Sequence, residues 1–366
     1  MKRPLHTGGD HQEGEQPADL PRNTILVGDV RDHLRALPDS SVDCIITSPP
    51  YYAIRNYNHE QQIGTEPDVD SWVATLREIC RDLARVLRPT GSLWLNLGDG
   101  YSRRPSEGAN AKSLLLGPSR VALALVADGW ILRNQVIWAK SNPMPSSVGD
   151  RLTTTHEVIY FFTRSRSYFF DLDAIRQPLV TTRRQSTRDP SRAYPPPGAG
   201  AVSRDGWKLN DNQGLSRMKA SGLAGHPLGK NPGDVWTLPT AGFRGRHFAA
   251  FPLALTERPL LATCPERVCP SCGRAWQREL ERQHGRLLAV GELQPTCQCG
   301  AEGVPGLVLD PFMGTGTTAL AAEKHGRDWL GIELNPAYVA LAEERLAAAR
   351  GTQEPPPAQP IAAQIN

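Results

Sequence analysis

Short apolar strands alternate with amphipathic helices in two separate blocks of the chain, and this alternation constrains the fold more than any other feature. In the first block, 23–170, a strand is predicted over 42–47. In the second block, 304–350, a predicted strand over 307–310, a Gly-rich turn and a helix over 317–325 follow one another. Such alternation is typical of a mostly parallel sheet covered by helices on both faces, so we expect an α/β fold. The other expected elements are strands over 23–27, 92–97, 130–138, 157–163 and 329–332, and helices over 30–37, 70–87, 119–128 and 336–350.

The composition is that of a folded globular chain. Of the 366 residues, 39% are apolar and 22% are charged, which argues against disorder of the whole chain. The sequence has no apolar run long enough to span a membrane, and its first residues are polar and acidic. We therefore expect no membrane span and no secretory signal, and we expect a cytoplasmic protein. The formal net charge of +3 is too small to indicate a nucleic-acid partner by itself.

The segments outside the two blocks differ from them in composition. Residues 1–22 and 351–366 are rich in polar residues and Pro, and are predicted to be a disordered leader and a disordered tail. Between the blocks, residues 176–230 hold ten Lys and Arg against three Asp. Such a segment is either a solvated linker or a loop-rich surface whose basic side chains contact the phosphates of a nucleic acid. The motifs on either side favour the second interpretation, so we assign 171–230 to target recognition.

The apolar strand that ends at Thr47 is followed directly by Ser48-Pro49-Pro50-Tyr51. Open parallel sheets bind their ligands at the carboxyl ends of the strands. Two consecutive prolines stiffen the backbone and remove two N–H donors, which leaves carbonyl oxygens free to accept hydrogen bonds. A hydroxyl, a rigid carbonyl and an aromatic ring in one place form a receptor for a planar group that carries an NH2. Taken alone, the same residues are also typical of a Pro-rich turn that leaves a strand.

A second motif lies between a strand and a helix of the second block. It runs from Asp310 through Gly314 and Gly316 to Thr317. The glycines allow a ligand to approach the backbone closely, and the N-terminus of the following helix suits a carboxylate or a phosphate. Glu333 follows one strand later, where it can accept hydrogen bonds from a ribose diol. Gly-x-Gly alone is weak evidence, and Glu333 alone is also compatible with an acidic residue near a helix N-terminus.

Together, the two motifs resemble those of the DNA amino-methyltransferases, which modify exocyclic nitrogens of DNA bases. In that family a Ser/Asp/Asn-Pro-Pro-Tyr tetrapeptide forms the catalytic pocket and a Phe-x-Gly-x-Gly turn binds the methyl donor. The catalytic motif comes first here and the donor motif last, which is similar to the order in the family's β group. The resemblance also includes the stretches 96–99, 138–143, 231–236 and 247–252.

The resemblance implies a Rossmann-like, circularly permuted sheet of the S-adenosylmethionine-dependent methyltransferases. The catalytic half would be 23–170, the cofactor-binding half 304–350, and a segment over 231–263 would close over the donor. The residues that it implies for catalysis are Ser48, Pro49, Pro50 and Tyr51. The residues that it implies for binding S-adenosylmethionine are Asp29, Phe251, Asp310, Phe312, Gly314, Gly316, Thr317 and Glu333.

The same resemblance implies a mechanism. Ser48 Oγ and the Pro49 carbonyl would accept hydrogen bonds from the amino group of a flipped-out base, and Tyr51 would stack on that base. Asp310 would hold the donor's amino group, Thr317 its carboxylate, Glu333 its ribose and Asp29 its adenine. Asp29 has a simpler alternative as a turn residue after Gly. Attack by a cysteine on the ring is not expected, because the sequence context of Cys44 and Cys80 is that of the core.

Within the family, a Ser at the position of Ser48 is usual for cytosine, and Asp or Asn is usual for adenine. We therefore expect a site-specific methyltransferase for the N4 atom of cytosine in double-stranded DNA, with adenine N6 as the alternative. A cognate restriction endonuclease is a candidate partner. Two other classes stay open: a methyltransferase that acts on RNA or on a protein amide, and a non-catalytic zinc-ribbon DNA-binding protein with a vestigial methyltransferase core.

Five of the seven cysteines fall between Cys264 and Cys299. Cys269 and Cys272 lie in one turn, and Cys297 precedes Cys299 by two residues. In a reducing compartment, two close pairs of thiolates favour a closed structural zinc site over disulfides. Cys264 is an alternative ligand, although it fits better in a helix that leads into this segment. We therefore expect an inserted zinc ribbon over 264–303, which either contacts DNA or supports the fold.

Overall fold

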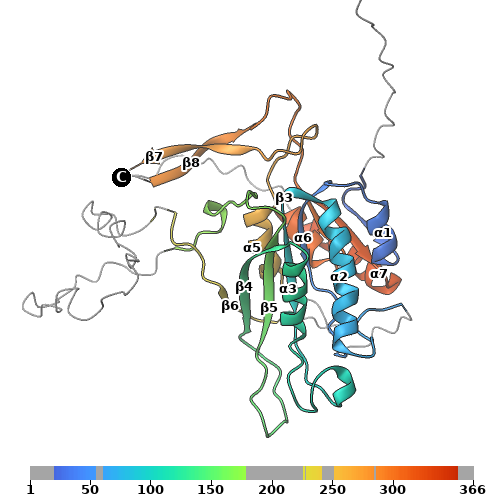
Figure 1. Cartoon of the computed structure of the whole chain (residues 1–366). Helices are drawn as coiled ribbons and strands as arrows, with labels where there is room; N and C mark the ends of the chain where they lie inside the picture. Colours follow the sequence, from blue (N-terminus) through green and yellow to red (C-terminus); the bar gives the residue numbers. More distant parts are fainter. Residues whose placement is uncertain are drawn as a thin grey trace, which may run out of the picture.

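The structure of the protein is a computed structural model, which describes residues 20–54, 61–178, 226, 228–240, 251–283 and 286–352. The predicted leader, recognition insert and tail lie mostly outside the described residues, and so does 241–250 of the predicted donor-closing segment. The described residues form an α/β body, from which a separate β-hairpin extends (Figure 1).

An eight-stranded sheet forms the centre of the body, with its strands in the order β1-β10-β9-β2-β3-β5-β4-β6. Among the described strands of this sheet, β5 alone runs antiparallel to its neighbours, and all other pairs are parallel. The predicted α/β class with a mostly parallel sheet is therefore confirmed. In sheet order the strands are β1 (Thr24–Val27), β10 (Asp328–Glu333), β9 (Leu307–Asp310), β2 (Val42–Thr47), β3 (Leu87–Leu97), β5 (His156–Thr163), β4 (Ile131–Lys140) and β6 (Val235–Leu238).

Observed helices and strands agree with the predicted ones to within two residues at each end, except at the start of β3. This strand begins at Leu87, which pairs with Val42, so residues 88–91, between the predicted helix and the predicted strand, form an irregular start of the strand. The short strand β6 and the hairpin of β7 and β8 are not among the predicted elements. No helix of the described chain is long and apolar enough to cross a bilayer. The helices are α1 (Val30–Ala36), α2 (Val69–Val86), α3 (Gly117–Ala127), α5 (Leu253–Thr263), α6 (Thr317–Lys324) and α7 (Pro336–Thr352), with short 3-10 turns at η1 (Pro105–Glu107) and η2 (Asp173–Ile175), and the hairpin strands are β7 (Gln277–Gln283) and β8 (Arg286–Gln294).

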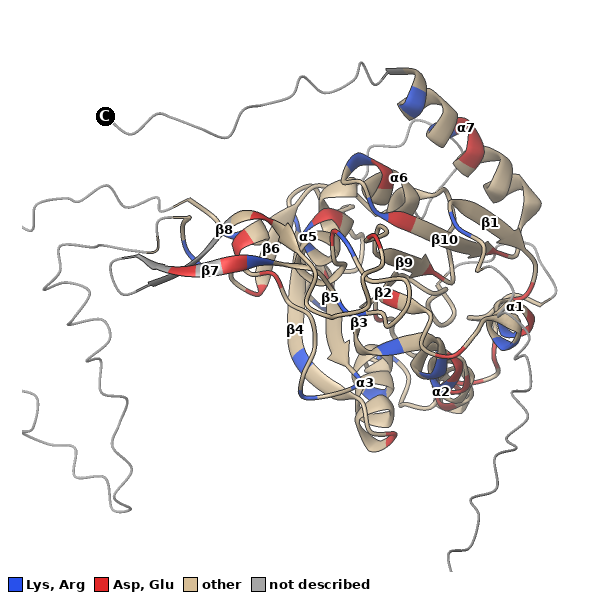
Figure 2. Cartoon of the chain, turned by 90° about the horizontal axis from the view of Figure 1, so that it is seen from above, with Lys and Arg blue, Asp and Glu red and all other residues tan. Residues whose placement is uncertain are grey.

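Side chains that alternate along the central strands fill two separate cores. On β2, Ile45 packs in one core, and Cys44 and Ile46 pack in the other. On β3, Leu93 belongs to the first core and Trp94 to the second. Figure 2 shows α2 and α3 on one side of the sheet and α6 and α7 on the other. All residues of β2 are buried, because a central parallel strand has helices on both of its faces.

A buried carboxylate joins the two blocks at the centre of the sheet. Asp310, at the end of β9, is 0% exposed and accepts hydrogen bonds from Thr47 Oγ1 at 2.8 Å and Thr318 Oγ1 at 2.6 Å. The backbone N–H of Phe312 donates a third hydrogen bond to it at 3.1 Å. Burial raises the pKa of Asp310 to about 6, although the hydrogen bonds from the two threonines oppose this rise. One side chain therefore ties the end of β2 to the turn that precedes α6.

We expect Asp310 to make stability depend on pH. Its pKa of about 6 in the folded protein lies above the ordinary value of 3.8, so its contribution to stability is complete at low pH and is lost as the pH rises through about 6. Relative to Asp310→Asn, the free energy of unfolding of the unaltered protein should fall by about 3 kcal/mol between about pH 3 and about pH 7. Chemical denaturation at a series of pH values measures this difference.

The matched control for this experiment is Asp32→Asn, a change at a carboxylate whose side chain is 76% exposed. It should leave the pH dependence of unfolding as it is in the unaltered protein. A difference between the unaltered protein and Asp310→Asn that stays constant over the same pH range would contradict the assignment.

Candidate active site

The carboxyl ends of four neighbouring parallel strands surround one cavity, which lies where β1, β10, β9 and β2 end. Eight of the predicted site residues line it: Asp29, Ser48, Pro50, Phe251, Phe312, Gly314, Thr317 and Glu333. Four others are not among its lining residues: Pro49, Tyr51, Asp310 and Gly316. The structure therefore brings the Ser-Pro-Pro-Tyr motif and the Gly-rich turn to one place from opposite ends of the chain.

Glu333 forms one wall of the cavity at the end of β10. Its side chain is largely buried, and its two carboxylate oxygens accept hydrogen bonds from the backbone N–H groups of Gly314 and Asn335, both at 2.8 Å. Each carboxylate oxygen has two lone pairs, so Glu333 keeps the capacity to accept further hydrogen bonds. Its place in the cavity wall is compatible with a ribose partner, and its hydrogen bond from Asn335, directly before α7, is also compatible with an acidic residue near a helix N-terminus.

The N-terminus of α6 reaches the cavity at Thr317. Arg345 of α7 donates hydrogen bonds to Thr315 Oγ1 at 2.7 Å and to Thr317 Oγ1 at 3.4 Å. Burial lowers the pKa of Arg345, but arginine stays charged in proteins. Since a guanidinium and a helix N-terminus both attract anions, this end of the cavity suits a carboxylate. Gly316 instead packs against α7, where an added Cβ would lie 3.0 Å from the Cβ of Ala342.

Asp29 serves the local fold and also lines the cavity. It is the N-cap of α1 and accepts a hydrogen bond from the backbone N–H of Arg31 at 2.8 Å. The Arg31 side chain binds both carboxylate oxygens, at 2.9 and 2.6 Å, and lowers the pKa of Asp29. The structure therefore supports the turn interpretation of Asp29 and is also compatible with a contact to a ligand.

The two carbonyls of the Pro-Pro turn have different surroundings. Trp72 Nε1 donates a hydrogen bond to the carbonyl oxygen of Pro50 at 3.0 Å. Within the described part of the chain, the Pro49 carbonyl accepts no hydrogen bond. Ser48, which precedes it, is half-buried and lines the cavity. Among the described residues, Pro49 thus has the carbonyl without a protein donor, but Pro49 is buried and does not line the cavity, so its contact with a base stays a prediction.

A network of polar side chains lies behind Ser48. Ser48 Oγ is 3.1 Å from Tyr51 OH, and Tyr51 OH donates a hydrogen bond to Glu157 Oε2 at 2.6 Å. Asn96 Nδ2 lies 3.2 Å from Ser48 Oγ, 2.8 Å from Tyr51 OH and 2.9 Å from Glu157 Oε2. Lys140 Nζ donates to the other oxygen of Glu157, Oε1, at 2.6 Å. Five side chains from four segments thus meet at the catalytic motif.

Tyr51 has a different setting from the one expected for a residue that stacks on a base. Its hydroxyl belongs to the polar network, and its ring packs so closely on Gly98 that an added Cβ there would lie 2.7 Å from Tyr51 Cε2. Stacking of Tyr51 on a target base stays a prediction, because the residue does not line the cavity.

Four charged or polar residues at the site were not predicted from the sequence. Asn96 and Lys140 fall in stretches that resemble the family, but no role was predicted for either. Glu157 carried a usable signal, since it is an acidic residue at the start of the otherwise apolar run Val158–Phe162. Arg345 carried a weaker signal, because it is one of four charged residues in helix α7.

Cys44 and Cys80 are 0% and 3% exposed, and burial raises the pKa of each thiol to about 12. Both predicted core positions are therefore confirmed. Neither thiol is ionised at neutral pH, so neither is a nucleophile.

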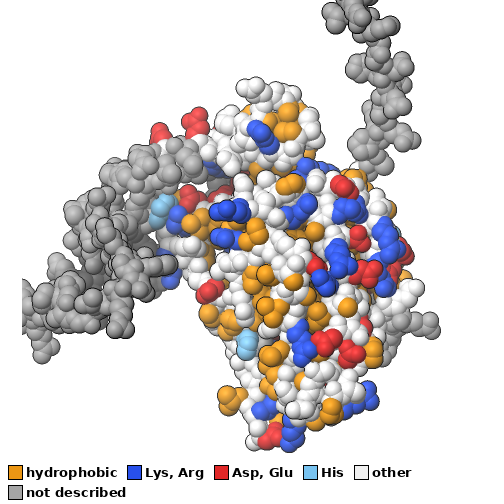
Figure 3. Space-filling view, viewed as in Figure 1, with side chains coloured by type: hydrophobic (Ala, Val, Ile, Leu, Met, Phe, Trp, Pro, Cys, Tyr) orange, Lys and Arg blue, Asp and Glu red, His pale blue; other side chains and the backbone are white. Residues whose placement is uncertain are grey.

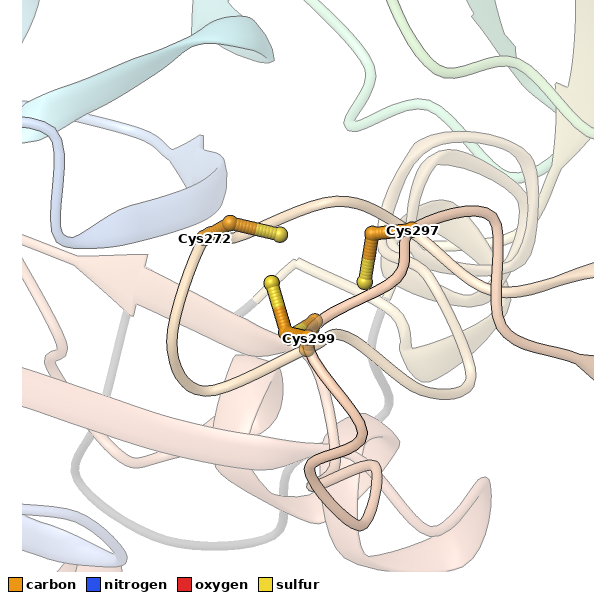
Figure 4. A group of neighbouring side chains, drawn as sticks. Cys272, Cys297 and Cys299 are labelled. Carbon is orange, nitrogen blue, oxygen red and sulfur yellow. The ribbon is translucent and has the colours of Figure 1, made fainter.

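The four predicted zinc-binding cysteines lie together, away from the cavity. The Sγ atoms of Cys269, Cys272, Cys297 and Cys299 are all within 4.8 Å of one another, and Figure 4 shows three of these side chains directed at a common point. Four sulfur atoms around zinc are about 3.8 Å apart, since Zn–S bonds are about 2.3 Å long, so the group fits this metal. Cys264 ends helix α5 and is 0% exposed, outside the group.

The thiols of this group influence one another. The backbone N–H of Cys272 lowers the pKa of the Cys269 thiol to about 6, whereas hydrogen bonds with the neighbouring thiols raise the pKa of Cys299 to about 12. Four thiolates together therefore need a cation between them. The turn that holds Cys272 is anchored to the sheet, because Gly273 packs on Arg88, which forms an ion pair at 3.0 Å with the buried Asp43.

Comparisons with known proteins identify the family of this chain. A family model described as DNA methylase matches residues 42–344. The type II methyltransferase M.XycI of Xanthomonas campestris pv. cyanopsidis is 32% identical over 353 residues, which cover 90% of this chain and 90% of that protein. The type II methyltransferase M.Cfr9I of Citrobacter freundii is 31% identical over 353 residues, with the same coverage of both chains.

Two solved structures are also similar. A DNA modification methylase of Thermus thermophilus complexed with S-adenosyl-L-methionine is 23% identical, with a TM-score of 0.49 over 90% of this chain and 96% of that chain. The PvuII DNA methyltransferase, described as cytosine-N4-specific, is 19% identical, with a TM-score of 0.48 over 90% of this chain and 91% of that chain. Since the family match over 42–344 spans most of the sheet and its cavity, and relatives above 30% identity cover nine-tenths of the chain, this protein belongs to the N6/N4 DNA methylases, the family of DNA amino-methyltransferases.

Proposed function

We propose that the protein transfers a methyl group from S-adenosylmethionine to the N4 amino group of cytosine in double-stranded DNA. The observation that carries the proposal is one cavity lined both by Ser48 of the catalytic motif and by Glu333 of the donor half. A Ser, rather than Asp or Asn, before the two prolines supports cytosine as the base. The relatives named type II methyltransferases support a role in a restriction–modification system.

The donor half of the cavity fits the parts of S-adenosylmethionine. Glu333 would accept hydrogen bonds from its ribose hydroxyls, and Thr317, at the N-terminus of α6 and beside Arg345, would hold its carboxylate. When bound, the donor supplies an electrophilic methyl group on a sulfonium. Contact between Asp310 and the donor's amino group remains a prediction, since the Asp310 carboxylate is 0% exposed and already accepts three hydrogen bonds.

Ser48 and Pro49 would prepare the amino group for reaction. The lone pair of an exocyclic amino group is delocalised into the base, which makes the nitrogen a poor nucleophile. Hydrogen bonds from the NH2 to Ser48 Oγ and to the Pro49 carbonyl would draw the nitrogen toward tetrahedral geometry and localise that lone pair. Such catalysis works by positioning and electrostatics and needs no covalent intermediate. The base has to leave the duplex stack to reach Ser48.

The strand order supports a circularly permuted methyltransferase sheet. If strands are counted from β9, so that β10, β1, β2 and β3 follow it, the order across the sheet becomes 3-2-1-4-5, as in doubly wound nucleotide-binding sheets. The order reverses between β9 and β2, and ligands of such sheets bind at this reversal. Asp310 and Thr47 meet at this point.

We assign target recognition to 171–230, which lies mostly outside the described residues. On the face seen in Figure 3, Lys and Arg side chains are interspersed with Asp and Glu and form no continuous basic patch among the described residues. The ten Lys and Arg of 176–230 are therefore the better candidates for contacts with DNA phosphates. The zinc ribbon of 264–303 would support the fold through its contact with Arg88.

Nucleoside mass spectrometry tests the proposed product. Unmodified DNA is incubated with the protein and labelled S-adenosylmethionine, and then digested. We expect labelled N4-methylcytosine. N6-methyladenine would keep the transfer chemistry and replace cytosine by adenine as the substrate. Label in RNA or protein but not in DNA, or no label with DNA from several sources, would contradict the proposal.

Ser48→Ala should reduce the single-turnover rate of methyl transfer by about a hundredfold or more, the effect of removing one preorganised hydrogen-bonding group. Calorimetry should find the affinity for S-adenosylmethionine unchanged, because Ser48 acts on the base and not on the donor. Glu333→Gln is the contrasting variant, and it should weaken donor binding. An unchanged rate in Ser48→Ala would remove Ser48 from the catalytic role.

The cysteine group should hold stoichiometric zinc, measurable by atomic absorption. Chelation, or the double variant Cys297→Ser with Cys299→Ser, should release the metal and lower the melting temperature, since metal binding is coupled to folding. The protein that remains folded should still transfer methyl groups, because the cysteines do not line the cavity. Ser271→Ala, in the same turn, should keep its zinc. Metal-free protein of unaltered stability would contradict a structural zinc site.

A further inference from the structure

We propose that Glu157 is a positioning residue that acts through Tyr51 to keep the Ser48 hydroxyl as a hydrogen-bond acceptor toward the amino group to be methylated. The inference rests on the proposed function and concerns the direction of the protons in the network behind Ser48. Glu157 belongs to β5, the antiparallel strand, and is more than a hundred residues from Ser48 in the sequence. The sheet brings the two residues together.

The phenol of Tyr51 has one proton, which it donates in a hydrogen bond to Glu157. The distance of 2.6 Å between Tyr51 OH and Glu157 Oε2 is that of a charge-assisted O–H···O hydrogen bond. Tyr51 therefore has no proton left for Ser48, whose Oγ is 3.1 Å from the same hydroxyl. At this contact Ser48 must be the donor.

Asn96 imposes the same direction. Its Nδ2 group is a donor only, and it lies within 3.2 Å of Ser48 Oγ, Tyr51 OH and Glu157 Oε2. Its two protons are shared among these three oxygens, each of which presents a lone pair to it. A rotated amide would place its oxygen against the carboxylate of Glu157. The Ser48 proton thus points at Tyr51 and one of its lone pairs at Asn96. The second lone pair is left for the cavity that Ser48 lines.

Lys140 makes the direction of the hydrogen bonds from Ser48 to Tyr51 and from Tyr51 to Glu157 testable. It donates to Glu157 Oε1 at 2.6 Å, so each oxygen of the carboxylate has its own donors. In Glu157→Gln, the side chain has a single oxygen, which can accept a hydrogen bond either from Lys140 or from Tyr51. The bond to the Lys140 cation is the stronger one, so the oxygen turns to Lys140 and the NH2 turns to Tyr51. Tyr51 then donates to Ser48, and Ser48 donates into the cavity, where an incoming NH2 needs an acceptor.

Single-turnover methyl transfer and donor calorimetry test the proposal. Glu157→Gln should lower the rate by about tenfold to a hundredfold with unchanged affinity for S-adenosylmethionine. In the double variant Glu157→Gln with Lys140→Met, the amide oxygen is free to accept a hydrogen bond from Tyr51 again. The rate of the double variant should therefore equal that of Lys140→Met alone. This single variant is the reference, because it measures the loss of the ion pair separately.

Two results would overturn the inference. The first is an unchanged rate in Glu157→Gln. The second is a rate loss from Glu157→Gln that is as large in the Lys140→Met background as with Lys140 present, because a merely structural role of Glu157 predicts equal losses. Tyr51→Phe is an independent variant for the case in which Glu157→Gln does not fold. It keeps the ring, removes the acceptor of the Ser48 proton, and should lower the rate about tenfold with unchanged donor affinity. An unchanged rate in Tyr51→Phe would also overturn the inference.

Ser48→Ala separates this inference from the proposed function. If Ser48→Ala loses activity while Glu157→Gln and Tyr51→Phe keep theirs, the inference fails and the proposed function stands. If Ser48→Ala keeps its activity, the catalytic assignment itself fails.

Discussion

Both halves of the site depend on the hydrogen bonds that converge on the buried Asp310 carboxylate. Thr47, which donates one of them, immediately precedes Ser48, and the N–H of Phe312 donates another at the start of the Gly-rich turn. The third, from Thr318, fixes the first turn of α6. Removing a carboxylate from water costs free energy, which its raised pKa of about 6 reflects and the hydrogen bonds partly offset. These hydrogen bonds hold the catalytic turn and the Gly-rich turn next to each other at one buried carboxylate.

Much of the fold could be predicted because its central strands carry two signals at once. Strands β2 and β9 are apolar runs that end near a proline. A proline follows β9 directly, and one residue separates β2 from its proline. Both the type and the bounds of these strands are therefore visible in the sequence. Strand β6 has only four residues and exists as a strand through its pairing with β4. In the hairpin, β7 is rich in charged and polar residues, and the apolar run 287–290 of β8 is interrupted by Gly291. Short or polar strands depend on their partners, and a partner is not visible locally.

The candidate site divides in the same way. Ser48, Gly314 and Glu333 are adjacent in sequence to the strand ends that place them, so local motifs were enough to find them. Glu157 reaches Tyr51 because β5 lies between β3 and β4 in the sheet, in register with Trp138 of β4. Arg345 reaches Thr315 because α7 packs on the Gly-rich turn. Such contacts follow from tertiary arrangement, and the sequence near each residue does not encode them.

The strand order also has a consequence for synthesis of the protein on the ribosome. Thr47 and Asp310, which meet at the centre of the sheet, are 263 residues apart in the chain, and β1 pairs with the still more distant β10. While the chain emerges, β1 and β2 therefore have open edges until β9 and β10 arrive, and contacts over such distances form slowly. A nascent chain can hold its Ser-Pro-Pro-Tyr turn but not the pocket beside it. The connectivity thus delays formation of the pocket until β9 and β10 have been made.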